Sequence, residues 1–135
     1  MTDDRFEFVT EMSIRYRDLD PWDHVNNAVY ATYLEQARIQ YLDAVLDESM
    51  GGRDFVLAHL ELDYQQSVEY RDELTIALRV SEMGTSSLSF AYEVRADGEV
   101  AATGETTQVH IGADGPAPLP DSWRETIEQF EPALA

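Results

Sequence analysis

The chain of 135 residues contains no cysteine and no lysine. The missing cysteine excludes disulfides, thiolate metal sites and a cysteine nucleophile. No apolar run approaches the roughly 18 residues that a membrane-spanning helix needs. The first residues, Met-Thr-Asp-Asp-Arg, lack the basic and apolar regions of a signal peptide. We therefore expect a cytoplasmic protein that does not enter a membrane.

Positive charge is scarce, because nine basic residues, all arginine, face 27 acidic ones and leave a net charge of −18. So acidic a chain lacks the basic footprint of a nucleic-acid-binding protein. An acid excess without lysine favours a halophilic protein, since high salt screens self-repulsion. A merely acidic mesophilic protein is the alternative. A halophilic protein should lose structure in dilute buffer.

The longest predicted element is an amphipathic helix from about Asn27 to Asp47, with Gly51 and Gly52 closing the segment. Its apolar residues recur at spacings of three and four, which is the period of a half-buried helix. The apolar stripe consists of Tyr30, Tyr33, Leu34, Ala37, Tyr41, Leu42 and Val45.

Alternation of apolar and polar residues predicts five β-strands. The first contains Met12, Ile14 and Tyr16. The other four lie at 56–64, 74–80, 88–94 and about 100–111. Turn signals at Gly84-Thr-Ser-Ser and Asp97-Gly98 join successive strands, so the sheet is antiparallel.

We interpret residues 1–135 as one domain, with a core at about 8–112 and a linker and short helix at 113–135. Ser122 and Glu125 resemble a capping box that opens the terminal helix. One helix cannot cover both faces of the sheet. We therefore expect a homodimer or homotetramer.

The most informative segment runs from Asp20 to Tyr30. Asp20 and His24 lie four residues apart in a polar loop, and Asn26 and Asn27 follow at the start of the long helix. Free N–H groups and the positive end of the helix dipole make such a start a favourable site for an oxyanion. A carboxylate beside that site suggests acyl-transfer chemistry.

The motifs Arg-Tyr-Arg-Asp18-Leu-Asp20, His24-Val-Asn-Asn and Tyr33-Leu-Glu-Gln-Ala-Arg38 resemble the hotdog-fold acyl-CoA thioesterases. The similarity is greatest to the 4-hydroxybenzoyl-CoA thioesterase-like group and extends to the acyl-carrier-protein thioesterases. It covers about residues 8–112. It implies an α+β hotdog fold, in which a five-stranded antiparallel sheet wraps one long central helix and active sites lie at dimer interfaces.

The resemblance also implies residue roles. Asp20 matches the catalytic carboxylate, which acts as nucleophile or general base. Asn27 falls where a backbone N–H polarises the thioester carbonyl. His24 matches a histidine of the acyl-carrier-protein branch, but Trp22 stands where that branch carries an asparagine, which weakens the match to a plant-like network.

Substrate-binding roles follow for four residues. Trp22 flanks the catalytic loop, Tyr30 could line the acyl pocket, and the turn with Thr85 and Ser86 resembles a segment near the coenzyme A chain. The expected substrate is an acyl-CoA or acyl-carrier-protein thioester. Coenzyme A is part of that substrate, so no separate cofactor is expected.

Each assignment has a structural alternative. Asp20 could be a turn former, and His24 could lock the loop by a polar contact. Asn26 and Asn27 are natural N-caps, while Tyr30 has the spacing of a core residue.

Charged residues elsewhere have open roles. Glu35 and Arg38 form either a surface ion pair or an interface contact. The coenzyme A phosphates call for arginines, with Arg71, Arg79 and Arg95 as candidates. His59, His110 and Asp18 are expected to be structural, and no histidine or cysteine stands at a metal spacing from His24.

Two other functions compete with thioester hydrolysis. A hotdog enoyl-thioester hydratase would resemble Asp-x-Asn-Pro-x-His, whereas this chain places its histidine four residues after Asp20 and lacks that asparagine and proline. A non-catalytic acyl-CoA-binding module is the other alternative. The absence of Gly-x-Ser-x-Gly disfavours serine-hydrolase chemistry.

Overall fold

The computed structural model describes residues 5–46 and 55–134. The elements are β1 (Phe8–Met12), a 3₁₀ turn (Tyr16–Asp18), α1 (Val29–Leu46), β2 (Phe55–Tyr64), β3 (Leu74–Met83), β4 (Ser87–Ala96), β5 (Glu99–Gly112), β6 (Gly115–Pro116), α2 (Asp121–Phe130) and a final 3₁₀ turn (Pro132–Leu134). Within these ranges, no helix combines the length and apolarity that crossing a membrane requires.

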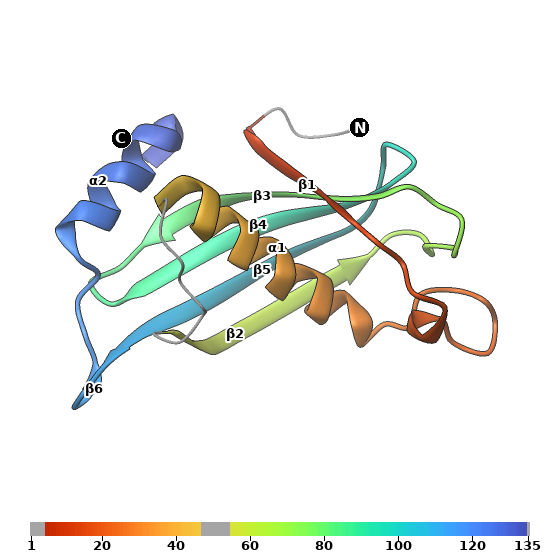
Figure 1. Ribbon diagram of the computed structural model, residues 1–135, viewed down its shortest axis with the longest axis horizontal. Helices are drawn as coiled ribbons and strands as arrows, with labels where there is room; N and C mark the ends of the chain where they lie inside the picture. The colour runs from red at the N-terminus through yellow and green to blue at the C-terminus, as the bar shows by residue number, and fades with distance from the viewer. Residues whose placement is uncertain (1–4, 47–54, 135) are drawn as a thin grey trace.

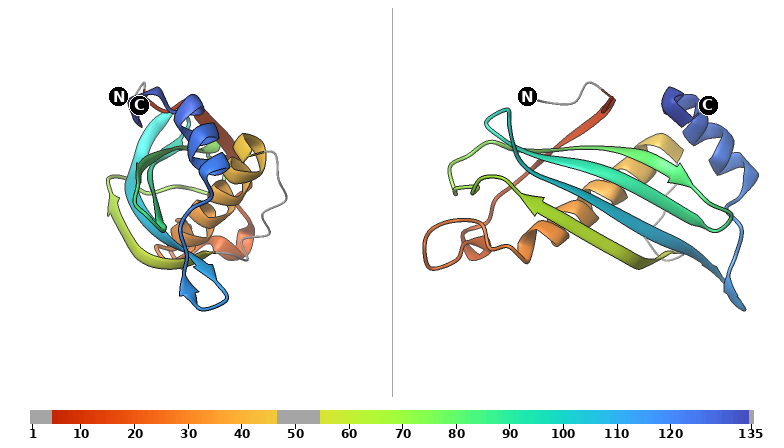
Figure 2. Two further views of the ribbon diagram at one scale, coloured as in Figure 1. Left: turned by 90° about the vertical axis from the view of Figure 1, so that its left-hand side faces the viewer. Right: turned by 180° about the vertical axis from the view of Figure 1, so that it is seen from behind.

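One antiparallel sheet curves around the long helix α1, as Figures 1 and 2 show. The strand order is β1-β3-β4-β5-β2, and the short β6 pairs with the end of β5. This confirms the predicted hotdog arrangement of five main strands and one central helix. The additional strand β6 lies inside the predicted linker, where the chain folds back on β5.

The core lies between α1 and the concave face of the sheet. Along β4, Leu88, Phe90, Tyr92 and Val94 point inward and are at most 1% exposed, as their alternation predicted. The ring of Tyr41 on α1 meets Phe90 edge-on, with centroids 5.2 Å apart. The predicted stripe on α1 is buried, apart from the partly buried Val45 at its end. Burial of this apolar surface is the main force that holds the helix in the sheet.

The structure corrects three predicted boundaries. The first strand ends at Met12, and Tyr16 instead opens a 3₁₀ turn with its ring 77% exposed. Helix α1 begins at Val29, two residues after Asn27, because the asparagines form a turn ahead of it. The capping box at Ser122 is wrong: α2 begins at Asp121, and Pro120 occupies the N-cap position without a side-chain hydrogen bond. The predicted helix end at Asp47 and the glycine pair after it lie outside the described residues.

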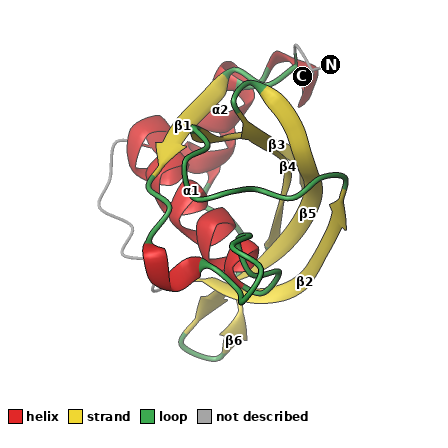
Figure 3. Cartoon of the chain, turned by 90° about the vertical axis from the view of Figure 1, so that its right-hand side faces the viewer, coloured by secondary structure: helices red, strands yellow, loops and turns green. Residues whose placement is uncertain are grey.

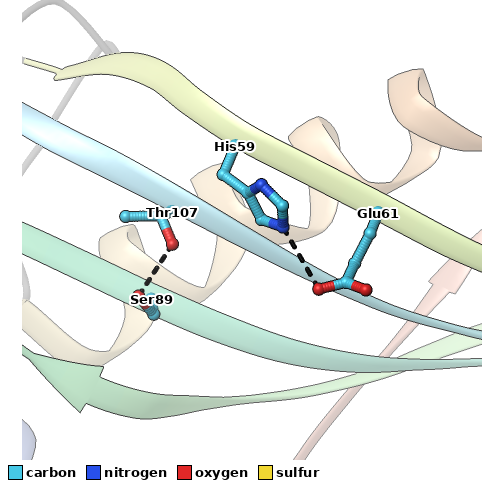
Figure 4. Close-up of polar contacts among 4 residues, drawn as sticks. All are labelled: His59, Glu61, Ser89 and Thr107. Atoms are coloured by element: carbon cyan, nitrogen blue, oxygen red, sulfur yellow. Dashed lines mark hydrogen bonds and ion pairs between the residues drawn. The ribbon is translucent and has the colours of Figure 1, made fainter.

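The convex face of the sheet, opposite α1, carries many polar side chains. Figure 4 shows four of them in front of the helix: His59 Nε2 lies 3.1 Å from Glu61 Oε1, and Ser89 Oγ lies 2.9 Å from Thr107 Oγ1. Polar side chains can face water without a cover. This face therefore does not by itself require a partner.

Candidate active site

The loop between the first 3₁₀ turn and α1 folds back on itself. The Asp20 backbone N–H donates to the His24 carbonyl at 2.7 Å, and the Asp23 N–H donates to the Asp20 carbonyl at 3.1 Å. Pro21 fits the second position of this turn, because its fixed φ suits that place. Asp23 has φ = 64°, a left-handed conformation that Asp tolerates better than most residues.

The Asp20 carboxylate is held by this turn. Its Oδ1 atom accepts hydrogen bonds from the backbone N–H groups of Trp22, at 2.9 Å, and His24, at 3.1 Å. Within residues 5–46 and 55–134, nothing hydrogen-bonds its other oxygen. Asp20 is therefore a turn former with one carboxylate oxygen available for chemistry. The Trp22 side chain beside it is 74% exposed.

Asn26 and Asn27 play different parts just before α1. Asn26 is structural, since its Oδ1 accepts from the Ala28 N–H at 2.8 Å and its carbonyl accepts from the Val29 N–H at 3.0 Å. The Asn27 backbone N–H has no hydrogen-bond acceptor in the described part of the chain. A free donor therefore lies beside the first turn of the helix, at the positive end of its dipole.

Asp18 anchors the loop to the helix. Its Oδ2 atom accepts from the Tyr33 hydroxyl at 2.8 Å and from the Arg15 backbone N–H at 2.9 Å. Burial, together with the hydrogen bond to Asp18, raises the pKa of Tyr33 well above its ordinary value. Asp18 thus has the structural role predicted for it.

The next loop, between β2 and β3, supports the first, and Figure 3 shows the two side by side. The Val25 N–H donates to the Val68 carbonyl at 2.8 Å, and His24 forms an isolated bridge with Glu69. These contacts use the backbone of His24. No described group hydrogen-bonds its imidazole, which leaves both ring nitrogens available.

Tyr30 lies in the core beneath the loop and is 2% exposed. The Tyr64 ring meets it edge-on with centroids 4.9 Å apart, and the Tyr64 hydroxyl donates to the Asn27 carbonyl at 2.9 Å. Burial raises the pKa of Tyr30. The two tyrosines thus support the backbone at Asn27 from below.

Thr85 and Ser86 lie at the opposite end of the sheet, in the turn between β3 and β4 beside α2 (Figure 1). The Thr85 carbonyl accepts from the Leu119 N–H at 2.9 Å and from the Arg124 guanidinium at 3.1 Å. A single chain therefore does not bring this turn to Asp20.

The three arginines considered for the coenzyme A phosphates differ in their surroundings. Arg95 pairs with Glu93 at 2.9 Å, and the guanidinium of Arg79 lies 5.8 Å from the ring centre of Phe6. Arg71 is exposed.

The structure also shows the contacts of His110 and of Glu35 and Arg38 on α1. His110 Nδ1 lies 3.1 Å from the Ala117 carbonyl oxygen, which fits the structural role expected for it. Glu35 and Arg38, both in the described part of the chain, form no ion pair with each other. Arg38 donates to the Tyr92 hydroxyl at 3.2 Å. Among residues 5–46 and 55–134, no three His, Asp or Glu side chains are grouped to hold a metal ion.

A cavity of about 300 Å³ opens between α1 and the inner faces of β2, β4 and β5. Its lining comprises Glu35, Arg38, Ile39, Leu42, Phe55, Leu57, Leu88, Phe90 and Gln108. Sequence reasoning missed it, because residues from four elements meet only in the folded chain. The available signal was Gln108, a polar residue at an inward-facing position of β5.

Comparison with known proteins identifies the family of this chain. Residues 14–127 match the family model of the thioesterase-like superfamily. A Thermus thermophilus thioesterase, solved with coenzyme A and zinc, superposes with a TM-score of 0.89 at 38% identity, over 96% of this chain and 98% of its own. The Escherichia coli long-chain acyl-CoA thioesterase FadM is 28% identical over 90% of this chain and 97% of its own. The uncharacterized Bacillus subtilis protein YsmA is 30% identical over 81% of this chain and 76% of its own. The chain therefore belongs to the thioesterase-like superfamily.

Proposed function

We propose that this protein hydrolyses an acyl thioester of coenzyme A, or of an acyl carrier protein, to the free acid and the thiol. One observation carries the proposal: the Asp20 carboxylate is fixed through one oxygen, and its free oxygen shares a loop with the free Asn27 N–H. Similarity to FadM and to the coenzyme A-bound Thermus thioesterase supports coenzyme A as the thiol.

The chemistry follows from these two groups. The Asn27 N–H binds the thioester carbonyl oxygen and stabilises the negative charge that develops there. The free oxygen of Asp20 either attacks the carbonyl carbon, giving an acyl anhydride that water then hydrolyses, or removes a proton from the attacking water. In both routes the C–S bond breaks, the thiol leaves, and the Asp20 carboxylate is regenerated. His24, with its ring unpaired, can hydrogen-bond the substrate from the same loop.

The active form in this proposal is a dimer through β2. This strand ends the sheet, and four of its residues with large apolar side chains are exposed: Val56 is 53%, Leu57 51%, Leu60 39% and Tyr64 47% exposed. A long apolar edge strand offers unpaired backbone groups to another strand. The other edge, β1, is only five residues long. Antiparallel pairing of two β2 strands would extend the sheet and cover these side chains.

Such pairing would complete the site. The end of β2 contacts the loop before α1, through Tyr64 and Asn27, whereas its first residue, Phe55, lines the cavity. A two-fold axis through β2 brings the end of one strand to the beginning of the other. The Asp20 loop of one protomer would then lie beside the cavity of its partner, at the end that carries Thr85 and Ser86. This accounts for the separation of Asp20 from that turn within one chain.

We predict that Leu60→Glu converts the oligomer to single chains, because the two-fold axis brings the two glutamates close together. Thiol release should fall in parallel. The separated chain should remain folded, as a measurable melting temperature would show. Analytical ultracentrifugation gives the mass. Val9→Glu is the matched control, since Val9 is 47% exposed on the opposite edge strand. A wild-type protein that is fully active as single chains would contradict the shared site.

The proposed hydrolysis is tested by release of free thiol from a panel of acyl-CoA esters. We expect turnover of at least one ester by the wild-type protein, with no added cofactor. A second series in about 0.1 M and 1 M salt tests the halophilic interpretation, because strong screening at 1 M should stabilise so acidic a chain. Hydration of an enoyl ester without thiol release would instead indicate a hydratase. Tight binding without either reaction would indicate a binding module.

A further inference from the structure

Gln108 is an unpaired polar group in the cavity. Its side chain lies on the inner face of β5 and is 5% exposed. Among the residues that the structure describes, neither its Nε2 nor its Oε1 atom has a hydrogen-bond partner. Most buried polar groups in proteins are paired, and an unpaired amide in an apolar site lowers stability. A group of this kind, directed into a ligand-sized cavity, is available to hydrogen-bond a bound molecule.

The cross-strand neighbours of Gln108 cannot supply that partner. Leu57 and Leu88 face it from the two adjacent strands, and both line the cavity. The other polar residues of the cavity lining are Glu35 and Arg38 on α1. Arg38 donates to the Tyr92 hydroxyl, which also lies 2.6 Å from Thr106 Oγ1. Gln108 therefore adds an unpaired amide to a cavity whose other polar side chains lie on α1.

We propose that Gln108 selects acyl groups that carry a hydrogen-bonding substituent, a hydroxyl or an oxo group. This inference rests on the proposed thioesterase function, because it makes the cavity the acyl pocket. An amide offers two donor hydrogens and an acceptor oxygen, so a hydroxyl can pair with either end and an oxo group with Nε2. The volume of about 300 Å³ accommodates a ring or a medium-length chain, given that a cavity of about 150 Å³ holds benzene.

The position of the cavity agrees with this role. It lies along the middle of α1, from Glu35 to Leu42, whereas the Asp20 loop precedes the start of the same helix. In the proposed dimer, the acyl chain would run from the partner's loop over β2 into the cavity. Gln108 would then contact the acyl group at a distance from the reacting carbonyl and act on selectivity rather than on the chemical step.

The test compares kcat/KM for matched esters that differ by one polar group. Suitable pairs are phenylacetyl-CoA with 4-hydroxyphenylacetyl-CoA, and octanoyl-CoA with hydroxyoctanoyl- and oxooctanoyl-CoA isomers substituted at different carbons. We expect the wild-type protein to prefer a substituted ester at least about ten-fold, since a site built for a hydrogen bond rejects analogues that lack it. The comparison of hydroxyl with oxo esters identifies which group is bound.

In Gln108→Leu this preference should fall to about one, and hydrolysis of the unsubstituted ester should rise. Thr106→Val is the control, because it removes a polar group from the same strand face that already has a partner. The control should keep the wild-type preference. Equal preference in the wild-type protein and Gln108→Leu, or no preference in either, would overturn the inference.

A binding measurement separates this inference from the proposed function. The free acids of the same pairs should raise the melting temperature of the wild-type protein more when they carry the polar group, and Gln108→Leu should lose the difference. If no ester is hydrolysed but this difference persists, the thioesterase proposal fails and the role of Gln108 stands. If hydrolysis occurs without any difference, the function stands and Gln108 is not a selectivity residue.

Discussion

Asp20→Asn is expected to lower kcat for thioester hydrolysis by about 10²–10⁴-fold, the usual effect of losing a general base, and by more if Asp20 is the nucleophile. Asparagine keeps an oxygen that can accept from the Trp22 and His24 N–H groups, so the loop should keep its shape. Only the charged, reactive oxygen is lost. Steady-state thiol release at saturating substrate measures the effect, and circular dichroism reports the fold.

Asp18→Asn is the matched control for this experiment. Asp18 lies two residues earlier and its carboxylate also accepts a backbone N–H, but its role is to hold Tyr33 and Arg15. Its replacement should affect stability more than kcat. If Asp18→Asn loses as much activity as Asp20→Asn, or if Asp20→Asn remains active, the wrong carboxylate has been assigned.

Incorporation of ¹⁸O into Asp20 during single-turnover hydrolysis in labelled water would then identify the nucleophilic route. A nucleophilic Asp20 acquires the label when water opens the anhydride at the aspartyl carbon. The product acid then carries an oxygen atom that came from Asp20. A general base leaves Asp20 unlabelled, because water attacks the substrate directly.

Glu131→Ala is expected to lower the free energy of unfolding by about 2–4 kcal/mol, because it leaves two buried donors without an acceptor. Glu131 is 3% exposed at the end of α2. Its Oε2 atom accepts from the Tyr41 hydroxyl at 2.6 Å and from the Val80 N–H at 3.0 Å. The register of β3 against β4 shifts just after Val80, and Glu131 supplies the acceptor for its N–H. Urea unfolding monitored by fluorescence measures the loss.

Glu131→Gln separates the charge from the hydrogen bonds. Burial raises the pKa of Glu131 above its ordinary value of 4.5. The folded protein therefore binds more protons than the unfolded chain above that value, and the contribution of Glu131 to stability falls as pH rises through the folded pKa. Glutamine keeps an acceptor for both donors and carries no charge. Its stability relative to the wild-type protein should increase from pH 4 to pH 7.

Glu128→Ala, an exposed change on the same helix, serves as the control and should alter stability by less than about 0.5 kcal/mol. A loss in Glu131→Ala no larger than in this control would show that the buried contacts contribute little. A stability difference between Glu131→Gln and the wild-type protein that does not change with pH would contradict the raised pKa.

The sequence predicted the elements best where one face is buried along a regular period. The alternation in β4 and the stripe on α1 each repeat a local pattern, so they could be recognised before the chain was folded. Element ends were less certain. The start at Val29 depends on how Asn26 hydrogen-bonds, and the start at Asp121 depends on Pro120, which are choices that periodicity does not encode.

The same division holds for the site. The sequence by itself determined that Asp20, His24 and Asn27 are close together, because they lie in one short loop before one helix. It also determined the family, through the motifs of that loop. Only the tertiary structure showed that one oxygen of Asp20 is occupied and the other free, since its partners are set by the turn.

Tertiary structure alone decided the cavity, the unpaired amide of Gln108 and the buried contacts of Glu131. The residues that form these features are far apart in the sequence, and which of them meet depends on strand register and on the docking of α2. A shift of one residue in β5 would turn Gln108 from the cavity to the convex face. Local patterns therefore determine the elements and the composition of the Asp20 loop, while packing between distant segments determines the cavity.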